Sequence, residues 1–377
     1  MNVAIVGIGN CASALYQGLH YYRNDTENNG LIKNEIGGYH INDINIKLAI
    51  DVDDRKVGKP LSEAIFQHPN CTPQYVHDYV LDKGPAVIRG PIIDGIANHM
   101  DSLGEDDPER FKVREVADRD DEEKKIFIDK ILQQYDIDIL INYLPVGSQL
   151  ATEFYAECCL RHNISLLNCI PVFIASNPEW EKKFIDKGIP LIGDDMKSQF
   201  GASILSQMLQ ELAHSRGMKV KSHIQRNIGG NTDFYNMMDK NRIVSKKISK
   251  ENVIKSQNTI RNIDDGSYLY AGPSEYIRYY KDNKVANIHM DMEGFMGSPI
   301  TLKAELSVID SPNSAGIVMD AIRYLKTARD MGMKGSLRGP SAFTQKTPPL
   351  QMEFKDALHE CELLSEKKLS NITKKQV

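Results

Sequence analysis

A glycine-rich turn near the N-terminus constrains the fold of this 377-residue chain more than any other feature. An apolar run, Val3 to Val6, leads into the sequence GIGNCA, and a helix-like stretch, Ala12 to Tyr22, follows. The pattern G-x-G-x-x-A between a strand and a helix is typical of dinucleotide-binding Rossmann domains. Gly7 permits the tight turn, Gly9 lets a pyrophosphate approach the backbone, and Ala12 lets the helix pack closely on the strand.

An acidic residue at the end of the second predicted strand extends this interpretation. The strand runs from Ile44 to Val52 and carries Asp51. An acid at this position accepts hydrogen bonds from the adenosine ribose and favours NAD over NADP; it usually follows the glycines by about 20 residues. The polar segment Arg23 to Asp43, which we expect to be a loop, accounts for the longer spacing here. The alternative is a Rossmann fold with an empty or different ligand. The expected NAD-binding residues of this region are Gly7, Gly9, Asn10, Cys11, Ala12 and Asp51.

Strand-like and helix-like segments alternate in the first half of the chain. We expect helices over Pro60 to Gln67 and Glu153 to Arg161, and apolar strands over Ile137 to Tyr143, Ile164 to Cys169 and Pro190 to Gly193. Such alternation predicts an α/β fold with a doubly wound parallel sheet, buried on both faces. Residues 101–125 alternate acidic and basic side chains, which favours a solvated insertion leading into a helix.

The pattern changes beyond about residue 220. Ala286 to Glu293 and Ile300 to Ile309 alternate apolar and polar residues, the period of strands with one wet face. A long helix is expected from Ser314 to Asp330. The second part of the chain is therefore predicted to be an α+β domain built on a largely antiparallel sheet.

Composition argues against several classes of function. The net charge is -5 and the densest basic cluster is only Lys246, Lys247 and Lys250, so we expect no nucleic-acid partner. No apolar stretch approaches about 18 residues and no signal sequence precedes the first strand, so we expect no membrane span. The six cysteines contain no C-x-x-C pair, which favours reduced thiols over a zinc site. These features predict a cytoplasmic protein.

Polar motifs with glycines, lysines and acids recur in the second half. They are GDDMKS at 193–198, NIGGNTD at 227–233, SKKISK at 245–250, DSPNS at 310–314 and QKTPP at 345–349. Asparagine- and glycine-rich turns with lysines within reach suit phosphate and hydroxyl recognition. A lysine beside another cation can transfer protons near neutrality and can stabilise an enolate or alkoxide. Each motif alone also has a structural interpretation, as a turn, an exposed helix start or a helix cap.

Together these motifs resemble the myo-inositol-1-phosphate synthase family, also called inositol-3-phosphate synthase. The matching stretches are VAIVGIGNCASAL, NYLPVGS, PVFIAS, GDDMKSQ, GGNTDFYN, SKKISK, DSPNSAG and QKTPP, in this order between residues 3 and 349. The length is similar to that of the short prokaryotic and archaeal members. The resemblance implies conversion of D-glucose 6-phosphate to 1L-myo-inositol 1-phosphate by oxidation at C5 with bound NAD, enolisation, aldol closure and re-reduction.

The resemblance also implies a set of site residues. The catalytic group is Lys246, Lys250, Lys284, Lys346 and Asp310. The substrate-binding group is Asn227, Asn231, Asp233 and Ser198. Further cofactor contacts are Tyr143, Asp195, Ser198, Asp233 and Lys246. Lys246 and Lys284 are expected to transfer protons and stabilise oxyanions, whereas Lys250 and Lys346 are expected to bind phosphate or the aldehyde oxygen. The substrate phosphate is an alternative base at C6.

The same resemblance implies a homotetramer and a division of the chain. Residues 1–200 would form the NAD-binding Rossmann domain, with 312–377 packing back on it, and 201–311 the catalytic and tetramerisation domain. A divalent cation with oxygen ligands is a further candidate cofactor, because some members use one. Two other functions fit the cofactor motif: an NAD-dependent sugar-phosphate dehydrogenase, which would release NADH at every turnover, and a non-catalytic NAD sensor, in which the pocket lysines would be dispensable.

Overall fold

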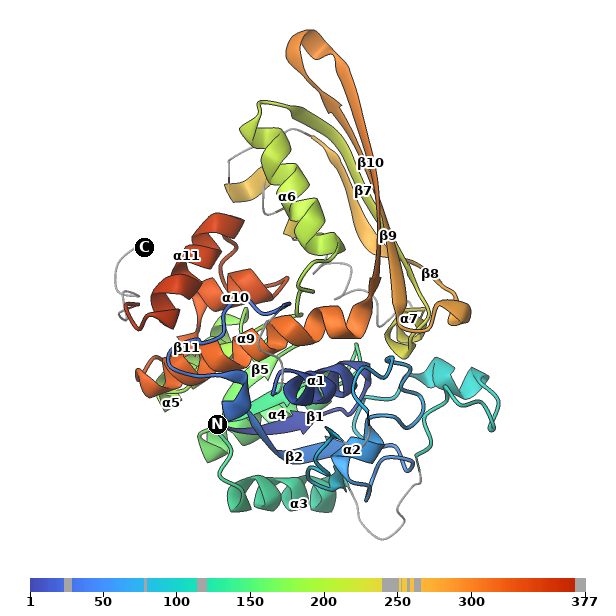
Figure 1. Cartoon of the computed structure of the whole chain (residues 1–377), viewed down its shortest axis with the longest axis vertical. Helices are drawn as coiled ribbons and strands as arrows, with labels where there is room; N and C mark the ends of the chain where they lie inside the picture. The colour runs from blue at the N-terminus through green and yellow to red at the C-terminus, as the bar shows by residue number, and fades with distance from the viewer. Residues whose placement is uncertain are drawn as a thin grey trace.

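A computed structural model of the chain describes residues 1–23, 29–77, 80–113, 121–238, 251, 253–255, 258–260 and 266–369. Within these ranges one sheet has seven strands, six from residues 2–192 and one from residues 335–336, in the order β11-β6-β5-β4-β1-β2-β3 (Figure 1). All of its paired strands run parallel. The strands are β1 (Asn2–Val6), β2 (Asn45–Asp51), β3 (Val87–Arg89), β4 (Ile139–Asn142), β5 (Ser165–Asn168), β6 (Pro190–Ile192) and β11 (Gly335–Ser336).

Helices cover both faces of this sheet and create two hydrophobic cores. Along β1, Val3 and Ile5 enter one core, whereas Ala4 and Val6 enter the other. This alternation explains why the central strands are apolar throughout. The helices of the first core are α1 (Asn10–Tyr21), α2 (Leu61–Ala64), α9 (Asp310–Asp330), α10 (Arg338–Thr344) and α11 (Phe354–Ser365). Those of the second are α3 (Asp121–Gln134), α4 (Gln149–His162) and α5 (Pro178–Lys187).

The second part of the chain forms a four-stranded sheet among the described residues, in the order β10-β9-β7-β8. The β10–β9 and β9–β7 pairs are antiparallel and the β7–β8 pair is parallel, so the prediction of a largely antiparallel sheet is confirmed. The strands are β7 (Lys219–Gly229), β8 (Tyr268–Tyr276), β9 (Asn283–Glu293) and β10 (Pro299–Ile309). Helix α6 (Ala202–Ser215) packs against this sheet through a small core that includes Ala213, Val220 and Ile288.

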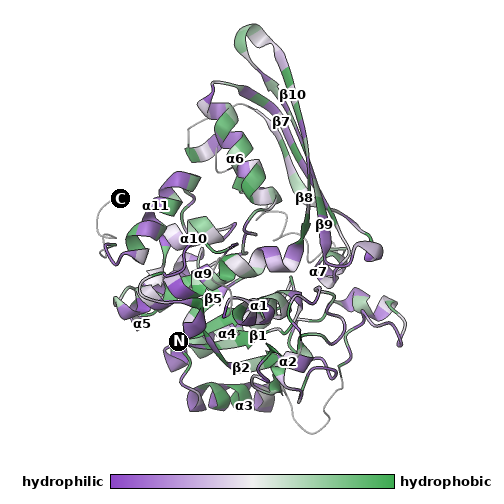
Figure 2. Cartoon of the chain, in the orientation of Figure 1, coloured by the Kyte–Doolittle hydropathy of each residue, from purple (hydrophilic) through white to green (hydrophobic). Residues whose placement is uncertain are grey.

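The two sheets differ in the distribution of hydrophobic residues. In Figure 2 the strands of the seven-stranded sheet are largely hydrophobic, whereas the long strands of the four-stranded sheet mix both colours. Every second residue of β9 from Ala286 to Met292 is buried, as the period-2 pattern predicted. Among the helices of the described ranges, none has the length and apolar character needed to cross a membrane.

Several predicted helix boundaries were wrong. Helix α9 begins at Asp310 rather than Ser314, because Pro312 lies in its first turn, where the missing N–H costs no helical hydrogen bond. Helix α4 begins at Gln149, four residues before the predicted start at Glu153. The helix predicted over 60–67 is limited to the four residues of α2.

The chain crosses between the two sheets at neighbouring points. It leaves the seven-stranded part at Phe200, just before α6, and returns through α9, which packs against α1. The two crossing points are joined by hydrogen bonds: the Gln199 N–H donates to the carbonyl of Asn313 at 2.7 Å, and the Asn313 amide donates to the carbonyl of Phe200 at 2.7 Å. The site described next lies between the two sheets.

Candidate active site

A large cavity lies at the carboxyl ends of the central parallel strands, between β1 and β4, where the strand order reverses direction. This is the position at which open parallel sheets bind nucleotides. The second sheet closes the cavity from above with α7 (Thr232–Asn236) and the start of β9. The predicted site residues that line it are Gly7, Gly9, Asn10, Cys11, Asp51, Tyr143, Asp195, Ser198, Asn231, Asp233, Lys284, Asp310 and Lys346.

The glycine turn has the geometry that a dinucleotide requires. Gly7 has φ +90°, and a Cβ there would lie 2.5 Å from the carbonyl oxygen of Tyr143, so only glycine fits. A Cβ on Gly9 would meet no atom within 4 Å, so the backbone at Gly9 is open to the cavity. Ala12 is fully buried below the turn, where it packs in the core as the motif predicted.

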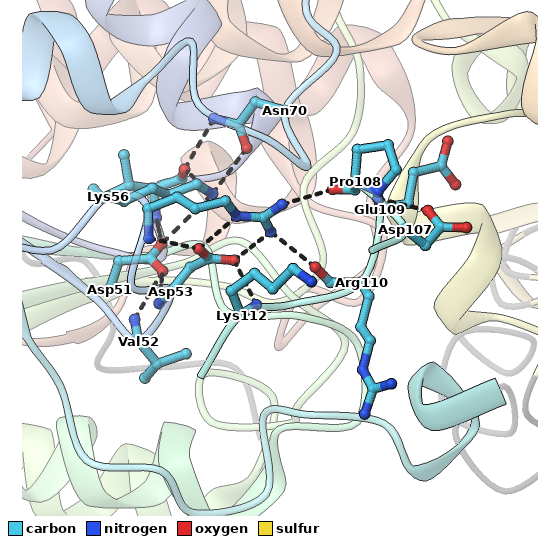
Figure 3. A network of polar contacts seen from close by, with 12 residues as sticks. Asp51, Val52, Asp53, Lys56, Asn70, Asp107, Pro108, Glu109, Arg110 and Lys112 are labelled. Atoms are coloured by element: carbon cyan, nitrogen blue, oxygen red, sulfur yellow. Dashed lines mark hydrogen bonds and ion pairs between the residues drawn. The ribbon is translucent and has the colours of Figure 1, made fainter. Parts of the chain in front are cut away.

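Asp51 supports this turn as well as lining the cavity (Figure 3). One of its carboxylate oxygens accepts the backbone N–H of Ile8 at 2.6 Å. The other accepts the N–H groups of Val52 and Asp53 at 2.7 and 2.9 Å. Three donors therefore fix the carboxylate at the position where a ribose would meet it.

Two buried lysines, neither of which was predicted as a site residue, donate hydrogen bonds to backbone carbonyls near the cavity. The Lys56 ammonium donates to the carbonyl of Ile8 at 2.8 Å, so the glycine turn is held from both sides; burial lowers the pKa of Lys56. Lys197, in the GDDMKS motif, donates to the carbonyl of Ala342 at 2.7 Å. Burial, together with nearby Lys346, lowers the pKa of Lys197 to about 7.

The GDDMKS and QKTPP motifs meet although about 150 residues separate them. The Lys346 ammonium lies 2.9 Å from a carboxylate oxygen of Asp195 and donates to the carbonyl of Met196 at 2.7 Å. The backbones also pair: the Lys346 N–H donates to the Asp195 carbonyl at 2.7 Å, and the Asp194 and Thr347 N–H groups donate to each other's carbonyls at 2.9 and 3.0 Å. The first lysine–carboxylate pair of the cavity is thus held by its backbone as well as by its charges.

Asp194, the other acid of the GDD turn, is buried behind this pair. Its carboxylate accepts the backbone N–H groups of Ile174, Ala175 and Ser176 at 3.0 to 3.1 Å, and the Asn168 amide at 2.7 Å. Burial raises the pKa of Asp194 to about 6 in spite of these donors. Asp194 therefore anchors the turn from which Asp195 reaches the cavity.

The second lysine–carboxylate pair comes from the four-stranded sheet and the following helix. The Lys284 ammonium lies 3.1 Å from a carboxylate oxygen of Asp310, at the first residue of α9. Asp282, two residues before Lys284, is buried and accepts the Ser311 hydroxyl at 2.8 Å and the Asn231 amide at 3.2 Å. Burial, together with nearby Asp310, raises the pKa of Asp282 to about 7. Sequence reasoning missed Asp282, because an Asp-Asn turn carries no local signal of burial.

Two predicted residues of the described ranges do not line this cavity. Ala12 is packed in the core below the glycine turn. Asn227 lies inside the second sheet, where its amide donates to the carbonyl of Gly272 at 2.8 Å and its oxygen accepts from Gln225 at 3.0 Å. Lys246 and Lys250 lie outside the residues that the structure describes. In the described ranges no group of three or more His, Cys, Asp and Glu side chains is arranged to hold a metal ion.

The fold and the cavity define a class of protein. A Rossmann-type sheet supplies a glycine turn with the Asp51 carboxylate beside it, and two lysine–carboxylate pairs, Lys346–Asp195 and Lys284–Asp310, lie at the same cavity. Basic and acidic groups around a dinucleotide-type turn are the equipment of an enzyme that combines redox and proton-transfer steps on a small polar substrate.

Comparisons with known proteins identify the family. The family model described as myo-inositol-1-phosphate synthase matches residues 201–311. The inositol-3-phosphate synthases of Mycolicibacterium smegmatis and Corynebacterium glutamicum are each 40% identical to the chain, over 93% of its length and 94% of theirs. The solved structure of a myo-inositol-1-phosphate synthase-related protein from Thermotoga maritima superposes with a TM-score of 0.74 at 22% identity, covering 97% of this chain and 98% of that one. The chain belongs to the myo-inositol-1-phosphate synthase family.

Proposed function

We propose that the protein is an inositol-3-phosphate synthase that converts D-glucose 6-phosphate to 1L-myo-inositol 1-phosphate, the first step of inositol biosynthesis. The observation that carries the proposal is the meeting of the glycine turn with two lysine–carboxylate pairs, Lys346–Asp195 and Lys284–Asp310, in one cavity. The names and high coverage of the bacterial relatives support the same activity. The reaction class is an intramolecular lyase, because the substrate is rearranged without net oxidation.

The residues around the glycine turn fit NAD. The exposed backbone at Gly9 offers the close approach that a pyrophosphate needs, and Asp51 offers a carboxylate to the ribose hydroxyls. When bound, NAD supplies a hydride acceptor for the oxidation and a hydride donor for the later reduction. Tyr143, Asp195 and Asp233 would flank its nicotinamide end.

The turn after β2 supports NAD rather than NADP. Asp51 places a negative charge where the 2′-phosphate of NADP would lie. Arg55, on the same turn, is engaged by the Asp53 carboxylate at 2.8 Å and by the carbonyls of Pro108 and Arg110 at 2.8 and 2.9 Å. Its guanidinium is thereby held by protein acceptors instead of being offered to a phosphate.

The lysine–carboxylate pairs suit the proton transfers and charge changes of the ring closure. Lys284 and Lys346 each present an ammonium group held in place by a carboxylate, so they can donate to an alkoxide or enolate oxygen without reorganising. Asn231 and Asp233, on α7 and its cap, and Ser198 offer hydrogen bonds to the sugar hydroxyls or phosphate. We assign Lys246 and Lys250 to the same site on the SKKISK motif alone.

Product analysis tests this function. Purified protein is incubated with glucose 6-phosphate and NAD, and the mixture is followed by phosphorus and proton NMR and by absorbance of NADH. We expect inositol monophosphate to form without accumulation of NADH. Accumulating NADH with an open-chain product would identify a dehydrogenase instead, and an unchanged substrate would reject glucose 6-phosphate. Lys246→Ala should still bind NAD and fail to turn over; normal turnover would refute the role of Lys246.

We also propose a homotetramer in the cytoplasm, with the chain divided into a Rossmann domain over 1–200, completed by 312–377, and a catalytic and tetramerisation domain over 201–311. Large exposed apolar side chains on and beside the second sheet support burial of its outer surface in an assembly. They are Phe200, Met208, Leu212, Tyr268, Phe295, Met296 and Ile300.

Light scattering after size exclusion tests the tetramer. Assays with chelator and added Mg²⁺ test whether a divalent cation takes part.

A further inference from the structure

Part of the charged stretch 101–125, which the sequence predicts to be a solvated insertion, bridges the two halves of the molecule. We call residues 98–113 the bridging segment. It begins with a 3₁₀ turn, Asn98–Ser102, and contributes Phe111 to the lining of the cavity. Residues 107–112 of this segment contact both sides: the turn after β2, which follows Asp51, and the connection between β8 and β9 of the second sheet.

The first anchor of the bridging segment is the turn after β2 (Figure 3). Arg55 donates to the carbonyls of Pro108 and Arg110 at 2.8 and 2.9 Å. The carboxylate of Asp53, which is fully buried, holds Arg55 and accepts the Lys112 N–H at 3.2 Å. This buried, charge-assisted network fixes the segment to the turn that supports the nucleotide-type motif.

The second anchor is an arginine of the four-stranded sheet. Arg278 begins the 3₁₀ turn Arg278–Tyr280 between β8 and β9. Its guanidinium contacts both carboxylate oxygens of Asp107, at 2.5 and 3.0 Å, and donates to Glu109 at 2.8 Å. The Tyr276 hydroxyl donates to the same Glu109. We call the contact of Arg278 with Asp107 and Glu109 the arginine clamp; its two-pronged geometry fixes direction as well as distance.

The turn held by the clamp packs tightly against Gly229 and Gly230, next to the cavity residue Asn231. The Ile277 N–H donates to the Gly229 carbonyl at 2.9 Å, and the Gly230 N–H donates to the Lys281 carbonyl at 3.1 Å. A Cβ on Gly230 would lie 2.3 Å from the Ile277 carbonyl oxygen, so the two backbones are in direct contact. Asn231 follows Gly230 directly. Displacement of the turn would therefore move the cavity residues that lie next to it.

The other end of the same turn leads to the reacting groups. Asp282, directly after Lys281, binds the Asn231 amide, and Lys284 follows two residues later. Lys284 in turn pairs with Asp310. A chain of contacts thus runs from the Asp51 turn through the bridging segment and the arginine clamp to the ammonium group that faces the cavity.

We propose that Arg278 is a positioning residue, which acts through Asp107 and Glu109 to hold the substrate-side residues in register with the nucleotide-binding turn. Its effect on turnover rests on the proposed function. A displacement of reacting groups by about 1 Å can cost on the order of 100-fold in rate. The clamp is partly exposed, so it contributes through geometry more than through stability.

Charge-neutral variants of the clamp test the proposal. In Arg278→Gln, kcat should fall roughly 10- to 100-fold, with KM for glucose 6-phosphate close to that of the parent protein. Asp107→Asn combined with Glu109→Gln should give the same loss, and the triple variant should be no worse, because all three remove one clamp. The matched control is Arg161→Gln: Arg161 is as exposed as Arg278 (47% against 48%) and pairs with Asp129 at 2.9 Å. It should keep full kcat.

A second measurement does not depend on turnover. Hydrogen exchange of the peptide over 277–284 is followed with and without NAD. We expect NAD to slow exchange in the parent protein and in Arg161→Gln, and to slow it much less in Arg278→Gln. If the parent protein leaves glucose 6-phosphate unchanged, the proposed function is refuted. The hydrogen-exchange measurement then tests the positioning role of Arg278 by itself. Equal kcat and equal exchange in Arg278→Gln and Arg161→Gln would overturn the proposal, as would full kcat in the double variant of Asp107 and Glu109.

Discussion

Replacement of Asp51 by asparagine gives the sharpest test of the cofactor site. The carboxylate accepts three backbone N–H groups with its two oxygens, at 2.6 Å from Ile8 and at 2.7 and 2.9 Å from the next two residues. The amide has one oxygen and one NH₂ group, so at least one of these N–H donors would face another donor. A hydrogen bond to a charged group contributes about 1.5–3 kcal/mol. Loss of one such bond, together with the ribose acceptor, should weaken NAD binding roughly 10- to 100-fold.

Isothermal titration with NAD measures this loss, and Asp54→Asn provides the control. Asp54 lies on the same turn and is similarly buried, but its carboxylate pairs with Arg89 instead of supporting the glycine turn. Its variant should bind NAD nearly as tightly as the parent protein. Thermal melting of both variants establishes that they are folded. Equal dissociation constants for Asp51→Asn and Asp54→Asn would refute the reasoning that assigns the ribose and the glycine turn to Asp51.

Three further predictions concern the lysines and the buried charges. Lys346→Met, which removes the partner of Asp195, should abolish formation of inositol phosphate with NAD affinity retained; NMR and titration measure both, and persistent turnover would contradict it. Because its pKa is raised to about 7, Asp282 contributes stability that is present below about pH 4 and is lost as pH rises through about 7. The melting temperature of Asp282→Asn should therefore rise relative to that of the parent protein between pH 4 and pH 8. A constant difference between the two melting temperatures over this range would refute the prediction. Arg323→Met leaves the buried Asp320 carboxylate unpaired and should lower the free energy of unfolding by about 3–5 kcal/mol in urea titrations; a change below about 1 kcal/mol would argue against the pair.

Much of the Rossmann-type fold could be predicted because its signals are local. The turn at Gly7 needs a positive φ, and the central strands are apolar on both faces, so each pattern directly reflects the structure around it. The start of α9 could not be predicted in the same way. Its first residues, from Asp310 to Asn313, read equally well as a cap before the helix or as its first turn, and only packing decides between them.

The candidate site was predicted in part. Its motif residues Asp195 and Lys346 meet because the stretch that follows α10 pairs through its backbone with the GDDMKS turn after β6. Asp282 and Lys197 escaped prediction, because a charged residue in a sequence is normally exposed and only tertiary contacts reveal its burial. The contacts of the bridging segment could not be predicted for the same reason. Alternating charges predict a solvated surface, whereas here Arg278, from the distant connection between β8 and β9, binds Asp107 and Glu109.

The neighbouring crossing points at Phe200 and Asn313 also have an evolutionary consequence. A segment whose two ends meet can be inserted into a host fold, removed from it or exchanged without disturbing the host's strand order. The four-stranded part of this protein is therefore an exchangeable insertion, joined to the nucleotide-binding part by two chain connections that lie next to each other. New substrates could be recruited by exchanging this insertion, provided that the new one again supplied an arginine for the host's acidic segment.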